Sequence, residues 1–178
     1  VTFLTDPEGA AFYFNAGKAV SKGIEFELSA RMPDNWYAQF SASWTKTTLG
    51  NDPDSRSLTA TPDNPDGVRD ADLPGSPDHN IYAALEKRFR VGGHEAFVRG
   101  DWTYVSQYFS FFNNFGEAGD YHLFSASAGI TVDNIRLSMF AKNLTNRDDF
   151  TWVDNTLGSG RAYRLRPRTI GANIGFNF

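Results

Sequence analysis

The chain has 178 residues and a formal net charge of −4, and it contains 40% hydrophobic residues, 15% aromatic residues and no cysteine. Without cysteine it forms neither disulfides nor thiolate metal sites, and its negative charge argues against a nucleic-acid-binding protein. No run approaches the roughly 18 consecutive apolar residues of a transmembrane helix, whereas a transmembrane β-barrel needs apolar residues only at alternate strand positions.

Alternation of apolar and polar residues runs through most of the chain and predicts β-strands. Residues 1–18 are predicted to form a short hairpin with arms at 1–4 and 11–14. After it, Ile24, Phe26 and Leu28 alternate with Glu25 and Glu27, so that one strand face is apolar and the other polar. The same pattern predicts seven longer strands, at residues 19–32, 36–49, 77–90, 95–109, 121–132, 135–142 and 162–178.

The predicted connections alternate strictly in length. Short ones are rich in Pro, Gly, Asn and Asp and lie at 33–35, 92–94 and 133–134, whereas long ones lie at 50–76, 110–120 and 143–161. Short periplasmic turns and longer extracellular loops are typical of transmembrane barrels. Trp36 and Trp44 share a strand face and lie about 26 Å apart at ~3.3 Å per residue, which fits two aromatic girdles.

A soluble β-sandwich or lipocalin-like barrel is the alternative to a membrane barrel, because it also alternates along its strands. Charged residues would dominate the outer face of such a soluble protein. Here the polar face is largely Ser, Thr, Asn, Gly, Gln and Tyr, as in a hydrated lumen, and this composition favours the membrane barrel.

Five short segments carry a family pattern when they are taken in order. They are Asn-Ala-Gly-Lys-Ala at 15–19, Lys-Gly-Ile-Glu-Phe-Glu-Leu at 22–28, Leu-Pro-Gly-Ser-Pro at 73–77, Lys-Asn-Leu-Thr-Asn-Arg at 142–147 and Arg-Pro-Arg-Thr-Ile-Gly at 166–171. Together they resemble the C-terminal barrel region of TonB-dependent outer-membrane receptors, along nearly the whole chain. Each segment is short and degenerate, and the specificity lies in their order and spacing.

The resemblance implies an all-β fold, an antiparallel transmembrane β-meander that forms the C-terminal part of a large plugged barrel of about twenty-two strands. Residues 1–178 are then expected to supply about seven strands plus an N-terminal extracellular hairpin. The plug, the TonB box and the N-terminal barrel strands are expected to lie outside this chain. The start at Val1, without a leader, indicates a mature product or a fragment.

By the same resemblance, the parent protein is expected to bind and import a scarce nutrient across the bacterial outer membrane, with an iron–siderophore complex as the default ligand. Its expected partners are the TonB complex, reached through the absent plug, and the barrel-assembly machinery, reached through the C-terminal strand. Outer-membrane lipid and lipopolysaccharide are expected to surround it, and no cofactor or nucleic acid is expected.

Signals of enzymatic activity are weak. The sequence has no Gly-x-Ser-x-Gly motif and no phosphate loop, and His79, His94 and His122 are not at metal-binding spacings. We therefore predict no enzyme. The alternative to a receptor is a small complete outer-membrane barrel that acts as a porin, an adhesin or a lipid-modifying enzyme.

An unusually aromatic segment in a predicted extracellular connection is the candidate ligand site. Aromatic rings beside Asn side chains fit a ring-bearing ligand such as a siderophore, and the alternative is that the loops pack on each other or on the membrane. The residues are Tyr108, Phe109, Phe111, Phe112, Asn113, Asn114 and Phe115.

Charged residues on the polar strand face are expected to face the lumen. They are Glu25, Glu27, Arg31, Arg99 and Asp101. Ion pairing within the wall is the favoured role for them, contact with the plug comes next, and contact with the substrate is least favoured.

Two groups near the C-terminus are expected at the membrane surfaces. Ile174, Phe176 and Phe178 resemble the assembly signal of outer-membrane barrels, or are simply the lipid-facing end of a strand. Arg164, Arg166 and Arg168 share the parity of Ile170, which predicts that they face outward and contact lipopolysaccharide phosphates. The alternatives are a rim solvated by water and a change of phase at Pro167.

Most of the negative charge lies in one segment, because residues 51–80 hold seven Asp and two Arg. Asn64, Asp66, Gly67 and Asp70 partly fit a calcium loop, but Pro62 stands at the first ligand position, so a solvated acidic loop is favoured and no metal site is predicted. Farther along, Asn143 and Asn146 are predicted to shape the turn after a strand.

Overall fold

The structure is a computed structural model, and it describes residues 2–5, 11–14, 18–49, 72–111, 115–154 and 160–176. Within these ranges the elements are β-strands and one 3-10 turn, η1, at Pro33–Asn35. No helix in the described part of the chain is long and apolar enough to cross a membrane.

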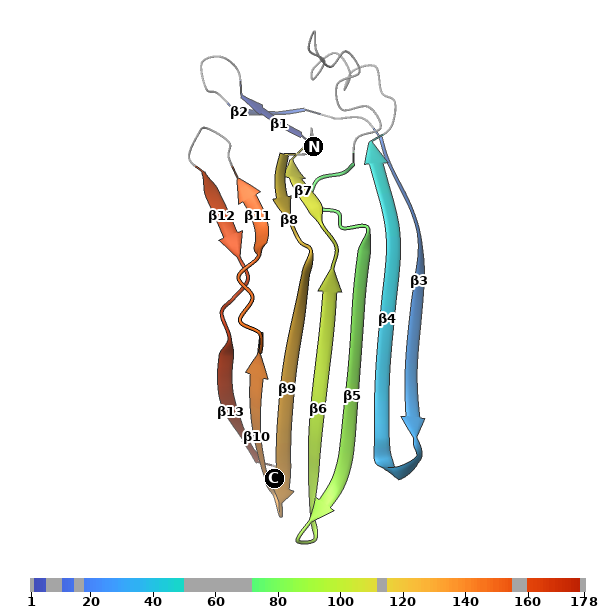
Figure 1. Ribbon diagram of the computed structural model, residues 1–178, viewed down its shortest axis with the longest axis vertical. Helices are drawn as coiled ribbons and strands as arrows, with labels where there is room; N and C mark the ends of the chain where they lie inside the picture. The colour runs from blue at the N-terminus through green and yellow to red at the C-terminus, as the bar shows by residue number, and fades with distance from the viewer. Residues whose placement is uncertain are drawn as a thin grey trace.

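Seven long strands form one antiparallel sheet without crossovers, in the order β13-β10-β9-β6-β5-β4-β3 (Figure 1). Each strand pairs with its neighbour in a continuous register, so the sheet is a meander. The strands are β3 (Ala19–Met32), β4 (Trp36–Leu49), β5 (His79–Val91), β6 (His94–Val105), β9 (Tyr121–Val132), β10 (Ile135–Lys142) and β13 (Thr169–Phe176).

Three small hairpins stand at one end of this sheet, and short turns close the other end (Figure 1). We call these the hairpin end and the turn end. At the turn end, Gly92 and Gly93 both have positive φ, as a two-residue hairpin turn requires. The hairpins pair β1 (Thr2–Thr5) with β2 (Ala11–Phe14), β7 (Tyr108–Phe111) with β8 (Phe115–Ala118), and β11 (Phe150–Asp154) with β12 (Arg161–Arg164).

Four of the predicted long strands, 19–32, 36–49, 121–132 and 135–142, are confirmed to the residue. The predicted strand 95–109 is wrong at its end, because β6 stops at Val105 and β7 begins at Tyr108. Its ladder ends where Ser106 bonds back to His79, with the Ser106 amide donating to the His79 carbonyl at 2.9 Å. The N-terminal hairpin is confirmed, with its first arm shifted by one residue to Thr2–Thr5.

The predicted strand 162–178 is also wrong, because residues 165–168 interrupt it between β12 and β13. Pro167 has no amide hydrogen to give to a ladder. The side chains of Asn143 and Asn146 also take backbone groups of Arg166 and Arg168 that a ladder would use. Arg164, Arg166 and Arg168 therefore do not share one strand, and the parity with Ile170 that predicted an outward direction for them does not hold.

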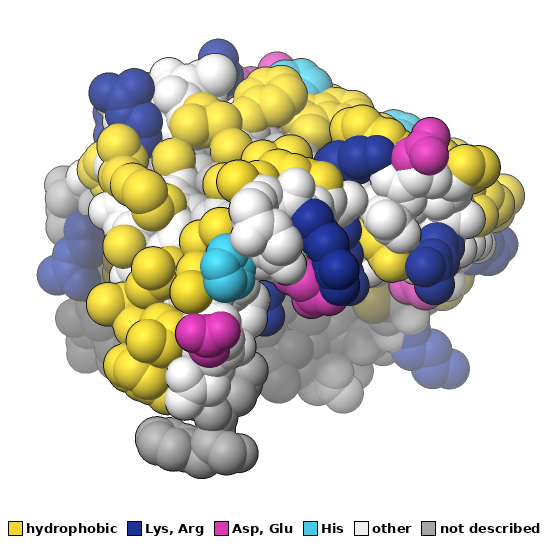
Figure 2. All heavy atoms as spheres, turned by 90° about the horizontal axis from the view of Figure 1, so that it is seen from below, with side chains coloured by type: hydrophobic (Ala, Val, Ile, Leu, Met, Phe, Trp, Pro, Cys, Tyr) yellow, Lys and Arg dark blue, Asp and Glu magenta, His cyan; other side chains and the backbone are white. Residues whose placement is uncertain are grey.

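The sheet has one apolar face. In β3 and β4 the opposed pairs on this face include Ile24 with Trp44 and Met32 with Trp36. The same face continues across the sheet to Ile170 and Phe176 on β13, which are 68% and 57% exposed. Seen from the turn end, hydrophobic side chains gather along one flank of the molecule (Figure 2).

A conventional hydrophobic core is nearly missing, because the described residues form a single layer. Among them only Leu49, Ala84, Ala96 and Ala118 are buried hydrophobic residues. A soluble monomer rarely exposes a contiguous apolar surface this large, since burying such surface drives folding in water. The apolar face of the sheet is therefore suited to contact with an apolar solvent and not with water.

Two aromatic rings on the opposite, polar face lie over glycines of the neighbouring strand. Phe140 pairs with Gly171, and a Cβ placed on Gly171 would lie only 2.5 Å from the ring Cζ. Phe97 covers Gly129 in the same way. Glycine is thus required at these two positions for the rings to lie flat against the sheet.

Candidate functional site

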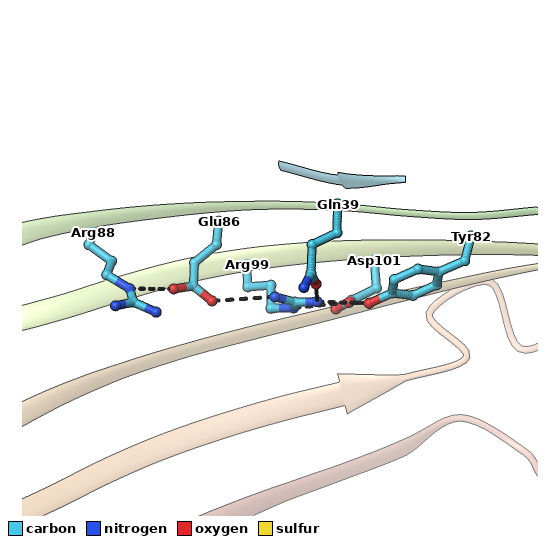
Figure 3. A network of polar contacts seen from close by, with 6 residues as sticks. All are labelled: Gln39, Tyr82, Glu86, Arg88, Arg99 and Asp101. Carbon is cyan, nitrogen blue, oxygen red and sulfur yellow. Dashed lines mark hydrogen bonds and ion pairs between the residues drawn. The ribbon is translucent and has the colours of Figure 1, made fainter. Parts of the chain in front are cut away.

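A network of polar side chains connects β4, β5 and β6 on the polar face, and Arg99 is its hub (Figure 3). The Arg99 guanidinium donates to Asp101 at 3.0 Å, to the Tyr82 hydroxyl at 2.7 Å and to the Gln39 amide oxygen at 3.0 Å. Tyr82 in turn donates to Asp101 at 2.7 Å. All three strands are thereby cross-linked by side chains as well as by their ladders.

Glu86 extends this network toward the turn end. Its two carboxylate oxygens lie 3.5 Å from Arg99 Nη1 and 2.6 Å from Arg88 Nε. Arg88 also stacks over the Tyr37 ring at 4.5 Å. A chain of alternating charge, Arg88–Glu86–Arg99–Asp101, therefore runs along the wall, and every member has a partner of opposite sign.

Arg99 and Asp101 are among the residues predicted from the sequence, whereas their partners Gln39, Tyr82, Glu86 and Arg88 are not. Glu86 alone had a usable signal in its register. The two-residue turn at Gly92–Gly93 sets the register of β5 and β6, and that register places Glu86 opposite Arg99. Gln39 carries no such signal, because it lies two strands away from Arg99.

The other three residues predicted to face the lumen lie on β3, on the same polar face but apart from the network. Glu25 and Glu27 line a hollow of about 280 Å³ together with Tyr82 and Thr103. Arg31 lies 5.6 Å from the centre of the Tyr37 ring. Among the described residues none of the three forms an ion pair, so the structure separates the predicted set into a paired group and an unpaired one.

A larger hollow, of about 460 Å³, opens on the polar face at the turn end. Arg88, Arg90 and Arg136 line it together with Glu86 and Glu95. Arg136 lies over the Phe97 ring at 5.3 Å and forms no ion pair among the residues that the structure describes. The hollow is thus a basic, aromatic-sided recess.

The aromatic segment at the hairpin end packs against a neighbouring hairpin. The Tyr108 hydroxyl donates to the Thr151 carbonyl at 2.6 Å, and the Val153 amide donates to the hydroxyl of the fully buried Ser110 at 2.9 Å. Phe111 meets the Trp152 ring at 5.7 Å, with the two planes inclined by 60°. Burial raises the pKa of the Tyr108 phenol above its ordinary value.

The candidate ligand residues are therefore divided. Tyr108 and Phe111 make contacts between hairpins, which was the alternative to ligand binding, and Phe109 is half-buried beside them. Phe112, Asn113 and Asn114 lie outside the described residues, and of Phe115 only the backbone is described. Contact with a ligand stays a prediction for this segment.

Asn143 forms a clamp where β10 ends. It is buried and has a positive φ of 51°. Its Nδ2 donates to the carbonyls of Arg147 at 2.7 Å and Arg166 at 2.8 Å, and its Oδ1 accepts from the Arg147 amide at 2.9 Å. Asn146 accepts from the Arg168 amide at 2.9 Å. The expected turn-shaping role of both asparagines is thus seen, and it extends to the segment before β13.

The C-terminal arginines have different surroundings. Arg164 is paired with Asp148 at 2.9 Å and lies over the Phe150 ring at 4.2 Å. Arg166 and Arg168 are exposed on the interrupting segment. Of the proposed assembly residues, Ile174 and Phe176 are exposed on the apolar face, and Phe178 lies outside the described residues.

The candidate calcium loop, with Asn64, Asp66, Gly67 and Asp70, falls outside the described residues. The end of the acidic segment is described, and there Asp72 and Asp78 pair with Lys46 at 2.7 and 3.4 Å. In the described part of the chain no group of three or more His, Asp or Glu lies close enough to hold a metal ion.

The fold and the two faces define a class of protein. A single-layer antiparallel meander that is apolar on one face and carries ion pairs on the other is part of the wall of a transmembrane β-barrel. A family model described as TonB dependent receptor-like, beta-barrel matches residues 1–144. The chain belongs to this family, and it is accordingly a protein of the bacterial outer membrane.

One solved structure that the fold resembles is the ferric yersiniabactin uptake receptor FyuA from Yersinia pestis. The TM-score is 0.78 at 20% sequence identity over 92% of this chain. The chain spans 24% of that receptor, about a quarter of its length, and the likeness concerns the fold. No curated protein matches the sequence at a significant level.

Proposed function

We propose that the chain is the C-terminal part of an energised outer-membrane receptor that imports a scarce nutrient, with a ferric siderophore as the ligand. The proposal rests on the antiparallel meander, which has one apolar face and one polar face, in a chain that belongs to the TonB-dependent receptor family. In this arrangement the apolar face meets lipid, and the network around Arg99 lines the lumen. The likeness to FyuA, described as a ferric yersiniabactin uptake receptor, supports an iron complex as the ligand class.

The open edges of the sheet support a large barrel over a small complete one. Among the described residues β13 and β3 end the sheet and do not pair with each other. An unpaired strand edge in lipid leaves backbone groups without hydrogen bonds, at a cost of several kcal/mol for each group. Further strands are thus needed on both sides, and we place them with the plug in the rest of the receptor.

The orientation follows from the ends of the sheet. Short turns are periplasmic and longer connections extracellular in such barrels, so the hairpin end faces outside. The hairpins β7–β8 and β11–β12 then carry the ligand-facing surface. The plug would reach the TonB complex from the periplasmic side, and the C-terminal strand would be read by the assembly machinery.

The test is uptake of radiolabelled ferric siderophores by cells that lack the full-length receptor. Deletion is expected to lower uptake of one siderophore at least tenfold under iron limitation, and uptake should collapse when the proton gradient is dissipated. Loss of cobalamin or oligosaccharide uptake instead would overturn the ligand class. Uptake that survives without the gradient would indicate a passive porin.

A matched pair of variants tests the ligand surface in the complemented strain. Phe109→Ala is expected to weaken siderophore binding, because this half-buried ring lies in the aromatic segment. Phe89→Ala removes an exposed aromatic from β5 near the turn end, away from the hairpins, and serves as the control. If both variants bind the siderophore equally tightly, Phe109 is not part of the ligand site.

A further inference from the structure

The basic recess at the turn end of the polar face is set into two neighbouring rows of the sheet. One row has an arginine at each end and crosses β5, β6, β9 and β10 as Arg90, Glu95, Thr131 and Arg136. In the next row toward the hairpin end, the Phe97 ring lies over Gly129, where a Cβ would come within 2.5 Å of the ring. The recess, of about 460 Å³, therefore has an aromatic floor and arginines on both sides.

Positive charge in this recess is not balanced, because three arginines line it against two glutamates. Both carboxylate oxygens of Glu86 are already engaged, at 2.6 and 3.5 Å, by arginines of the network around Arg99. Glu95 lies 4.0 Å from Arg90, and the two side chains are 79% and 72% exposed. Arg136 has no carboxylate at ion-pair distance among the described residues, so its charge is open to an anion.

Two of the three arginines are held by aromatic rings. The guanidinium carbon of Arg136 lies 5.3 Å from the centre of the Phe97 ring, and that of Arg88 lies 4.5 Å from the centre of the Tyr37 ring. Such contacts attract the cation to the ring and restrict the long side chain. A guanidinium keeps its N–H donors in one plane, where they match the two oxygens of a carboxylate. Groups that are already ordered lose less conformational entropy when an anion binds.

We propose that this recess is an anion-binding site on the route of the transported ligand, which then carries at least one free carboxylate. Arg136 binds the carboxylate, and Arg88 and Arg90 hold further positive charge beside it. A volume of about 460 Å³ fits such a ligand, because small-molecule sites range over ~300–1,000 Å³. Arg90 and Arg136 are exposed to water, which keeps the contact weak and permits release of the ligand.

The inference rests on the proposed function and narrows its ligand. With the hairpin end outside, the recess lies at the periplasmic end of the wall, where the ligand leaves the lumen. Its arginines thus select iron complexes by charge after the extracellular hairpins have bound them. Binding of an anion to the recess is measured without any transport, so the site and the transport function fail separately.

The first test is titration of the full-length receptor, in mild detergent at low ionic strength, with benzene-1,3-dicarboxylate under saturation-transfer NMR. The unmodified receptor is expected to bind this dianion more tightly than the neutral benzene-1,3-dicarboxamide, which has the same shape. Arg90→Gln with Arg136→Gln should weaken binding of the dianion about tenfold, because each exposed charged contact contributes up to about fivefold.

Lys142→Gln is the matched control for the charge. Lys142 lies on the same strand and face as Arg136, and its ammonium group also lies over a phenylalanine ring, 5.6 Å from the centre of Phe140. This variant should bind the dianion as the unmodified receptor does. Equal binding of the dianion and the diamide would overturn the anion site, and so would binding of the dianion by the double arginine variant within twofold of the unmodified receptor.

The second test measures uptake of the radiolabelled ferric siderophore that the deletion strain fails to import, with folding of each variant checked by heat-modifiable migration in gels. The double arginine variant is expected to keep siderophore binding at the surface of de-energised cells and to take up the ligand about fivefold more slowly, whereas Lys142→Gln should keep both. Uptake by the double variant at the unmodified rate would overturn the proposal. So would entry of vancomycin into cells that carry the double variant, since the arginines would then hold the plug in the barrel. Binding of the dianion through these arginines in a receptor that imports no siderophore would support the anion site and contradict the proposed function.

Discussion

Asn143→Ala removes the clamp between the end of β10 and the segment before β13. Three hydrogen bonds of 2.7, 2.8 and 2.9 Å are lost at a residue that is only 6% exposed. Each bond contributes about 1 kcal/mol net, and an alanine at positive φ adds about 1 kcal/mol of strain. The expected loss is about 4 kcal/mol for opening this corner.

Native-state hydrogen exchange on the full-length receptor measures this opening directly. A loss of about 4 kcal/mol corresponds to roughly 1,000-fold faster exchange at residues 165–170. Amides in β4 and β5 are the internal reference and should keep their rates. Asn143→Gly separates the two causes, since glycine accepts the positive φ but cannot make the three bonds.

Unchanged exchange at residues 165–170 in Asn143→Ala would mean that the three contacts do not hold this corner. Protection that Asn143→Gly restores to that of the unmodified receptor would assign the effect to backbone strain alone.

Three further changes test the faces of the sheet and the hairpin packing in the same receptor. Gly171→Ala should destabilise the fold by about 1–3 kcal/mol in thermal unfolding, because its Cβ would lie 2.5 Å from Phe140, whereas Gly100→Ala meets nothing within 4 Å and should be neutral. Leu28→Arg should cost about 2–4 kcal/mol in refolding into lipid vesicles, while Ser29→Arg on the polar face should cost little, and equal effects would contradict the assignment of the faces. Tyr108→Phe should cost about 1 kcal/mol and speed exchange in β11, since it loses the 2.6 Å bond to Thr151. Because burial raises the pKa of Tyr108, this contact stabilises the hairpins below pH ~10 and weakens as pH rises past that value, and Tyr108→Phe should lack that alkaline loss.

The long strands of the barrel wall could be predicted from the sequence because two independent signals agree there. Alternation fixes which side chains share a face, and short turns fix where the strands end. Strands 19–32 and 36–49 are bounded by both signals, with η1 between them, and were predicted to the residue. The pairing of Glu86 with Arg99 follows from the same kind of turn at Gly92–Gly93.

The strands at the hairpin end could not be predicted in the same way. Outside the lipid, neither strand face has to be apolar, so alternation no longer marks strands, and the hairpins β7–β8 and β11–β12 were missed. The break before β13 depends on Asn143, which lies 23 residues from Arg166 in sequence. Pro167 signalled a possible irregularity, but only the folded contacts show that it ends the ladder.

The candidate site was predicted only in part for a related reason. Arg99 and Asp101 were found from their charge and parity on one strand. Gln39 reaches Arg99 from two strands away, and no local pattern records that contact. Residues that act through neighbours on other strands are visible only once the register of the whole sheet is known.

The lack of an interlocking core gives the two faces different tolerance for change over evolutionary time. Side chains such as Ile24 and Ile170 meet fluid hydrocarbon and no fixed partner, so another large apolar residue serves equally well at these positions. Arg99 meets four specific groups at hydrogen-bond or ion-pair distance, and few replacements can reproduce them. Drift should therefore accumulate on the lipid side, while the residues of the network around Arg99 should change little.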